Sequence, residues 1–214
     1  MQKIPTIIVS IFVFLLPLFL LSGAIHFVAF DESFYNAQFE RLQVYDSFSE
    51  DVVLEQSSDV RNYLKGEGVL DSEFFNAREI HHLEDVKNLL WLNKISWILL
   101  GIILLACILV LMMRKEWITL SLMFKTSGIV TMVITVVVSL IAFLGFRAMF
   151  IAFHEVAFSN NLWNLNPAVD NLIVLFPEGF FIAAFTRILL LMFLIALIIM
   201  FLGMLVNKTY QKFK

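Results

Sequence analysis

Four long apolar runs constrain this chain more than any other feature. They cover residues 4–30, 95–113, 129–146 and 180–206. Each is apolar on all sides and long enough to cross a bilayer core about 30 Å thick as a helix. The backbone of such a run must form its hydrogen bonds within the segment, which favours helices. With 60% hydrophobic residues in the chain, we predict an all-α membrane protein with four transmembrane helices.

The first run stands where a secretory signal peptide would stand. Its apolar stretch is too long for a signal peptide, and only Lys3 supplies a positive charge before it. We expect it to remain as an uncleaved first span, kinked at Pro17.

Charge is distributed unevenly along the chain, and this predicts its orientation. Residues 31–94 carry 14 acidic and six basic side chains, a net charge of −8. Because basic residues favour the cytoplasmic side, we expect both termini there and residues 31–94 outside. The basic residues used are Lys3, Arg114, Lys115, Lys125, Lys208, Lys212 and Lys214.

The expected organisation has four parts. Residues 1–30 form the first transmembrane helix, 31–94 a small and mostly helical extracytoplasmic acidic cap, 95–206 a three-helix membrane core with an outer loop at 148–179, and 207–214 a cytoplasmic basic tail. Within the cap, residues 34–45 favour a helix, with a strand as the alternative. Ser58-Asp59 is a candidate helix cap, and Lys65-Gly66-Glu67-Gly68 is a candidate turn.

Two histidines at the edges of apolar runs are the main candidates for chemistry. His82 and His154 are expected on the same membrane face, and imidazole suits proton transfer near neutral pH. Glu79, His82 and Asp85 are spaced i, i+3, i+6 and share a helix face, so a carboxylate is placed to fix the tautomer of His82. The alternative is a solvated charged helix entering the membrane.

His154 belongs to a second polar stretch. Arg147 lies seven residues before it and so shares its helix face. An irregular polar segment anchored by Trp163 follows, and Asp170 and Glu178 lead into the last span. Such backbone is tolerated near the membrane where it lines a protein cavity. An interfacial loop with helix caps is the alternative.

Arg187 lies inside the last span, about 10 Å below Phe180 at 1.5 Å per residue. A charge at that depth needs a partner or a polar cavity. Glu178 or Asp170 is the expected partner. The alternative role of Arg187 is to polarise an ester carbonyl.

Several functions find no support. Cys107 is the only cysteine and lies in an apolar run, which excludes an intramolecular disulfide and a cysteine metal site. The acidic outer segment makes nucleic acid an unsuitable partner. Glycine-rich phosphate loops, serine-hydrolase elbows and His-Glu-x-x-His zinc motifs are missing from the sequence.

Two stretches of the chain form longer motifs. The first stretch contains Arg78-Glu79, His82-Leu83 and Asp85-Val86-Lys87. The second, longer stretch contains Phe153-His154, Phe158, Trp163, Leu165, Pro167, Asp170, Leu172-Ile173, Phe176-Pro177-Glu178 and Phe180-Phe181. Together they resemble the bacterial lipoprotein intramolecular transacylase family of small membrane proteins. The resemblance extends over nearly the whole chain and also fits its four spans.

The resemblance implies a function. In diacylglyceryl-modified lipoproteins, the family moves the sn-2 acyl chain to the α-amino group of the N-terminal cysteine, giving the lyso form. It implies that His82 and His154 are catalytic. The physical arguments above, and not the resemblance, lead us to expect supporting roles for Arg78, Glu79, Asp85, Arg147, Trp163, Asp170, Glu178 and Arg187. Because ester and amine belong to one molecule, no acyl-enzyme is needed, and holding them together can contribute about 7–11 kcal/mol. We expect neither a metal nor a cofactor.

Two other functions stay open at this point. Glu79, His82 and His154 are also suitable ligands for a metal-dependent membrane hydrolase. A non-enzymatic assembly factor or sensor would instead use the acidic cap to bind a partner. For every alternative, membrane lipids surround the four spans.

Overall fold

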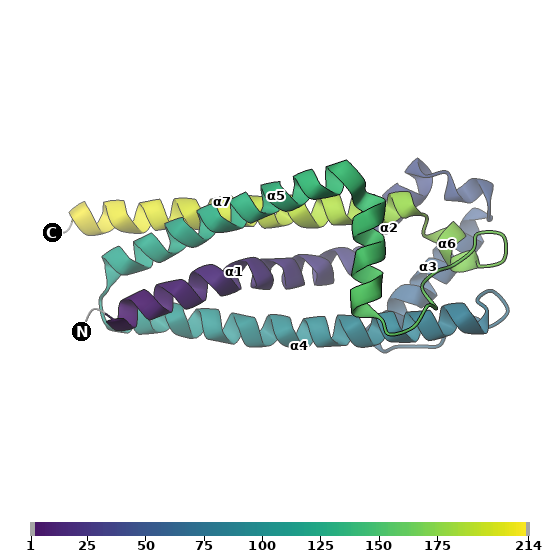
Figure 1. Ribbon diagram of the computed structural model, residues 1–214, viewed down its shortest axis with the longest axis horizontal. Helices are drawn as coiled ribbons and strands as arrows, with labels where there is room; N and C mark the ends of the chain where they lie inside the picture. The colour runs from purple at the N-terminus through teal and green to yellow at the C-terminus, as the bar shows by residue number, and fades with distance from the viewer. Residues whose placement is uncertain (1–2, 213–214) are drawn as a thin grey trace. The chain divides into compact units, whose positions relative to one another are not determined.

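The computed structural model describes residues 3–212, and every regular element in that part of the chain is helical (Figure 1). Four helices are long and apolar enough to cross a membrane, which confirms the predicted fold class. Lys214, one of the basic residues used to predict the orientation, lies outside the described residues, as does the end of the predicted 207–214 tail. The elements are α1 (Lys3–Ala29), α2 (Glu32–Arg41), the 3-10 helix η1 (Val44–Asp46), α3 (Glu50–Lys65), α4 (Ala77–Met113), α5 (Trp117–Ala157), α6 (Asn171–Leu175) and α7 (Glu178–Lys212).

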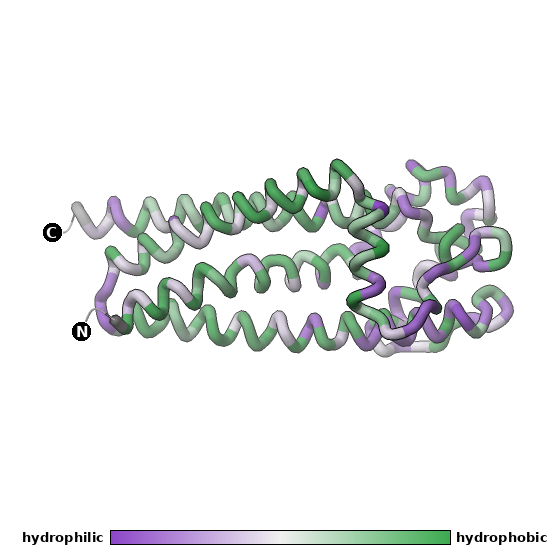
Figure 2. Tube along the Cα trace, viewed as in Figure 1, coloured by the Kyte–Doolittle hydropathy of each residue, from purple (hydrophilic) through white to green (hydrophobic). Residues whose placement is uncertain are grey.

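The chain forms two compact units. The first contains residues 3–25, 94–140 and 188–212 of the described part, and the second contains residues 26–93 and 141–187. Hydropathy separates them as well, since the helices of the first unit are predominantly apolar and the second unit carries most of the hydrophilic residues (Figure 2).

In the first unit, small residues let helices approach closely. A Cβ added at Gly128 on α5 would lie 2.7 Å from the carbonyl oxygen of Ala196 on α7, so these two helices are in backbone contact. The hydroxyl of Ser121 donates to the carbonyl oxygen of Gly203 at 2.7 Å. The buried hydroxyls of Ser127, Thr131 and Thr135 donate to carbonyl oxygens one turn earlier, as hydrocarbon surroundings require.

The second unit begins with a capped helix. The carboxylate of Asp31 accepts from the backbone N–H groups of Ser33 and Phe34, which fixes the start of α2. The segment expected as helix or strand is therefore helical from Glu32 to Arg41. Ser58 and Asp59 lie inside α3, so their predicted capping role is wrong. The N-cap of α3 is Ser49, and Gly66, with φ of 96°, ends that helix in the predicted turn.

Aromatic packing joins α2 to the segment around α6 and α7. The rings of Tyr35, Phe39, Phe176 and Phe180 lie within 6.1 Å of one another in several pairs. The Tyr35 hydroxyl donates to the Ala29 carbonyl oxygen at 2.8 Å, and burial raises the pKa of this tyrosine to about 12.

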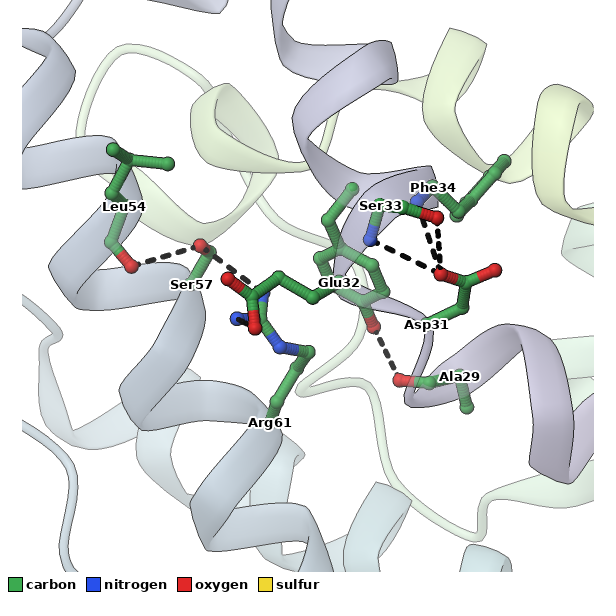
Figure 3. A network of polar contacts seen from close by, with 9 residues as sticks. Ala29, Asp31, Glu32, Ser33, Phe34, Leu54, Ser57 and Arg61 are labelled. Carbon is green, nitrogen blue, oxygen red and sulfur yellow. Dashed lines mark hydrogen bonds and ion pairs between the residues drawn. The ribbon is translucent and has the colours of Figure 1, made fainter.

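The guanidinium of Arg61 on α3 lies over the Tyr35 ring. Figure 3 shows the same guanidinium near the Ser57 hydroxyl and the Glu32 carboxylate. This polar network lies beside the aromatic cluster. Together they connect α2 and α3.

The helices also extend beyond the predicted apolar runs. Helix α4 begins at Ala77, so the charged segment that contains His82 is continuous with the second span. Helix α5 continues to Ala157, with one kink at Gly145. His154 therefore lies in the last turn of a helix, within the segment predicted as the outer loop.

Candidate functional site

His82 and His154 lie together in the second unit. Their ring centroids are 6.1 Å apart, although the residues are 72 positions apart in sequence. The side chains come from the polar start of α4 and the last turn of α5, and both residues are buried, with 8% and 7% exposure. Topology reasoning expected both histidines at one membrane face, and the structure brings them into one cluster.

Aromatic rings surround the pair. Phe158 contacts both histidines, with ring centroids 5.3 Å from His82 and 5.5 Å from His154. Phe150 and Trp163 pack against His154 at 4.2 and 4.9 Å. Burial of this kind favours neutral imidazole rings, and a neutral imidazole can accept a proton.

The hydrogen bonds of the two rings differ. Nδ1 of His154 lies 2.7 Å from the carbonyl oxygen of Phe150. Because a carbonyl only accepts, we assign the proton to Nδ1, which leaves Nε2 of the neutral ring as an acceptor. Nδ1 of His82 is buried and has no hydrogen-bond partner among residues 3–212.

Glu79 does not have the role expected from its spacing to His82. Its side chain is 1% exposed, and its two oxygens accept from the backbone N–H of Asn76 at 2.7 Å and of Leu172 at 2.5 Å. Glu79 thus completes a capping box with Asn76 at the start of α4. Its other oxygen binds the start of α6. The expectation that it fixes the tautomer of His82 is wrong, because both its oxygens face backbone donors.

Asp170 reinforces the same junction. One of its oxygens accepts from the Asn76 side chain at 2.8 Å and the other from the backbone N–H of Asn166 at 2.6 Å. The residue is buried and forms the N-cap of α6. These bonds attach the irregular segment before α6 to α4.

Arg78 holds the earlier part of that segment. Its guanidinium donates to the carbonyl oxygens of Asn161 at 2.6 Å, Asn164 at 3.0 Å and Leu162 at 3.4 Å. These carbonyls flank Trp163, whose ring packs against His154. The indole N–H of Trp163 is buried and, among the described residues, has no acceptor.

Asp85 lies three residues after His82 on α4. Its carboxylate accepts from the side-chain amide of Asn160 at 2.8 Å. Asp85 is partly exposed. Its contact with Asn160 attaches the segment after α5 to α4 at a second place.

Arg187 is paired, but with neither of its predicted partners. Its guanidinium forms an ion pair with Asp31, the residue that caps α2. Hydrogen bonds from the Ser33 hydroxyl and the Phe34 N–H, with the Arg187 charge, hold the pKa of Asp31 below its usual range. The predicted pairing with Asp170 or Glu178 is wrong, because Asp170 binds Asn76 and Glu178 is exposed.

Arg147 is also exposed. Within residues 3–212 no side chain forms a hydrogen bond or an ion pair with it, and no contact joins it to the histidine pair. Across the same residues, His, Cys, Asp and Glu side chains form no group of three suited to a metal ion. The metal-hydrolase alternative required Glu79 as a ligand, and that carboxylate is bonded to backbone.

The sequence of the chain matches the lipoprotein intramolecular transacylase family over residues 10–181. The chain belongs to this family. As a lipoprotein intramolecular transacylase it is an acyltransferase, which confirms the predicted enzyme class and the resemblance on which that prediction rested.

Solved structures agree with this assignment. The structure of the membrane-integral lipoprotein intramolecular transacylase Lit from Bacillus cereus matches with a TM-score of 0.89 and 20% sequence identity, covering 99% of this chain and 100% of that one. A second structure of that protein, with one histidine replaced by arginine, gives a TM-score of 0.85 at 20% identity, with coverages of 99% and 96%. At this identity the likeness shows a shared membrane-integral helical fold. A comparison with curated protein sequences gives no match.

Three of the residues that form these contacts were missed in the sequence. Asn76 caps α4 and bonds Asp170, and the pattern Asn-x-x-Glu at residues 76–79 is a capping-box signal that identifies such a residue. Asp31 lies before a helical pattern and is equally recognisable as an N-cap. No local signal identifies Asn160 as the partner of Asp85, because 75 residues separate them.

Proposed function

We propose that this enzyme moves the sn-2 acyl chain of a diacylglyceryl-modified lipoprotein to the α-amino group of its N-terminal cysteine, with His82 and His154 as the catalytic residues. The observation that carries the proposal is the buried pair of imidazoles 6.1 Å apart, centroid to centroid. The product is the lyso form, with an N-acyl cysteine and one acyl chain left on the glyceryl group.

The reaction needs one proton acceptor and one proton donor. The amine nitrogen attacks the ester carbonyl carbon and gives its proton to one imidazole. The glyceryl oxygen takes a proton from the other imidazole as the carbon–oxygen bond breaks. Two buried rings this close resist double protonation, so the pair carries at most one extra proton at a time: the proton taken from the amine nitrogen balances the proton given to the glyceryl oxygen.

A hydrogen-bond donor for the developing oxyanion completes the chemistry. The arginines considered for this purpose are engaged or distant, since Arg187 pairs with Asp31 and Arg147 has no contact with the histidines. The indole N–H of Trp163 is buried beside His154 without an acceptor. We assign the Trp163 N–H the role of stabilising the oxyanion, because a buried donor without an acceptor is energetically costly and the oxyanion supplies that acceptor.

The remaining site residues support this arrangement by positioning. Arg78, Glu79 and Asp170 fasten the segment that carries Trp163 and α6 to the start of α4. We further propose that the site faces the extracytoplasmic side of a bacterial cell membrane, where diacylglyceryl lipoproteins reside, and that both termini are cytoplasmic, as the basic segments favour.

The test is mass spectrometry of the N-terminal lipopeptide of a reporter lipoprotein. Cells are compared with the intact protein, without it, and with His82→Ala or His154→Ala. The N-acyl, S-monoacylglyceryl cysteine is expected with the intact protein alone. His81→Ala is the matched control, because His81 is exposed and pairs with Glu84. Full product from both site variants, at equal membrane abundance, contradicts the proposal.

A further inference from the structure

A small pocket lies next to the histidine pair. It has a volume of about 200 Å³ and is lined by α4 and by the residues that follow α5. Phe158, whose ring contacts both His82 and His154, forms part of its wall. The pocket and the histidine pair therefore share the Phe158 wall. The pocket is open to the surroundings, whereas the histidines are buried.

The pocket has a polar wall and an apolar wall. Asp85, Asn88, Ser159 and Asn160 supply polar groups, while Leu89 and Leu92 extend along the next turns of α4. A site of this kind suits a ligand with a small polar group on an apolar body.

Charge identifies the polar group. Asp85 is the only charged residue of the lining, and no lysine or arginine in the described part of the chain forms an ion pair with it. The nearby Lys87 lies over the Tyr63 ring, 4.2 Å from its centroid. One Asp85 oxygen accepts from Asn160, and the other has no donor among residues 3–212. The pocket thus presents an uncompensated negative charge.

We propose that this pocket binds the α-ammonium group of the lipoprotein substrate, with Asp85 as its counter-ion. This inference rests on the acyl transfer proposed above. Asp85 lies three residues after His82, one helical turn away on the same face. An ammonium held by Asp85 is therefore presented to the imidazole of His82. His82 takes the ammonium proton and passes it to water, which leaves a neutral amine for the attack. Asp85 then selects substrates whose amino group is free.

Binding to an unreactive substrate analogue tests this directly. The probe is a cysteine lipopeptide with a dialkylglyceryl group, in which ethers replace both esters, made with a free or an N-acetylated amino group. Wild type should bind the free-amine form about fivefold to tenfold more tightly at pH 6.5, as expected for one partly solvated charge pair. Asp85→Asn should reduce this preference to near unity.

Three further variants separate charge from structure. Asn160→Ala removes the hydrogen bond to Asp85 but keeps the charge, so the preference should remain. Glu84→Gln removes an exposed acid from the same helix and should change nothing. Asn88→Asp adds a second acid to the pocket and should strengthen the preference about twofold to fivefold, a gain that does not depend on the folding of Asp85→Asn.

The outcomes distinguish this inference from the proposed function. Equal binding of both probes by wild type, or an undiminished preference in Asp85→Asn, overturns the ammonium pocket. The ester-linked lipopeptide, assayed in parallel for N-acylation by wild type, tests acyl transfer on its own. Product formation without an amine preference leaves the enzyme function intact and rejects the pocket.

Discussion

At the residue scale, two charged side chains support the candidate site by binding backbone groups. Glu79 and Arg78 together engage five main-chain groups, those of Asn76, Asn161, Leu162, Asn164 and Leu172. Burial makes the Glu79 bonds strong, since losing a partner leaves a donor unsatisfied.

Glu79→Gln tests that statement. The amide has one acceptor oxygen, so it can serve only one of the two N–H groups and places an NH₂ group against the other. We expect the free energy of unfolding to fall by about 1–3 kcal/mol, seen as a lower melting temperature in detergent. Glu84→Gln, at a side chain that is 59% exposed, is the control. Equal melting temperatures for the two variants would contradict a stabilising role for the two Glu79 hydrogen bonds.

Trp163→Phe tests the role proposed for the indole N–H. The ring against His154 is kept, and the donor is lost. We expect kcat for N-acylation to fall about 10²-fold with little change in binding of the ether-linked probe. Trp91→Phe, at an exposed tryptophan, should have no effect. If kcat survives in Trp163→Phe, the ring acts by packing and the oxyanion has another donor.

At the element scale, the helices were predictable and their partners were not. The apolar runs predicted four spans because hydrocarbon permits few other structures. The span ends were not predicted, since polar turns such as the one carrying His154 continue the helix beyond the hydrophobic signal. Arg187 was expected to find an acid nearby in sequence, yet it pairs with Asp31, 156 residues away. Local pattern contains no information about such a pair.

The start of α2 has a predictable pH dependence. The pKa of Asp31 is lowered in the folded protein, so its stabilisation is present above the unfolded value of about 3.9 and is lost as pH falls through the folded value. The difference in melting temperature between wild type and Asp31→Asn should therefore be large at pH 6 and shrink below pH 4. Asparagine still caps a helix, so the difference reports charge. A difference independent of pH would contradict this account.

The contact of α5 with α7 gives a second prediction for an element. Gly128→Ala places a methyl group 2.7 Å from the Ala196 carbonyl oxygen and 2.9 Å from the Met200 backbone nitrogen. Backbone cannot move aside as a flexible side chain can, so we expect a loss of about 1–3 kcal/mol in stability. Gly145→Ala adds the same group where nothing lies within 4 Å and serves as the control. Comparable melting temperatures for both variants would show that α5 and α7 can move apart without a loss of stability.

At the scale of the whole molecule, we expect the distribution of charge to determine the membrane orientation. Lysine and arginine gather at Arg114 and Lys115 between α4 and α5, at Lys125 near the start of α5, and near the C-terminus, while residues 31–94 are acidic. The sequence alone predicts this arrangement, because the bias depends on composition and not on packing.

Cysteine labelling in intact cells measures the orientation. Cys107 is the only cysteine, so Cys107→Ala supplies a background for single cysteines at the exposed residues Glu67 and Arg114. A membrane-impermeant maleimide should label Glu67→Cys in intact cells and Arg114→Cys only after lysis. The reverse pattern would place the histidine pair on the cytoplasmic face and remove the proposed substrate from its reach.

The three carbonyls held by Arg78 have a consequence for sequence change over time. A main-chain carbonyl is the same whichever residue supplies it, so positions 161, 162 and 164 can be substituted without losing the guanidinium contacts. Trp163, between them, keeps its place against His154 while its neighbours vary. We therefore expect transplanted versions of this segment from distant relatives to be accepted, provided that arginine and tryptophan are retained.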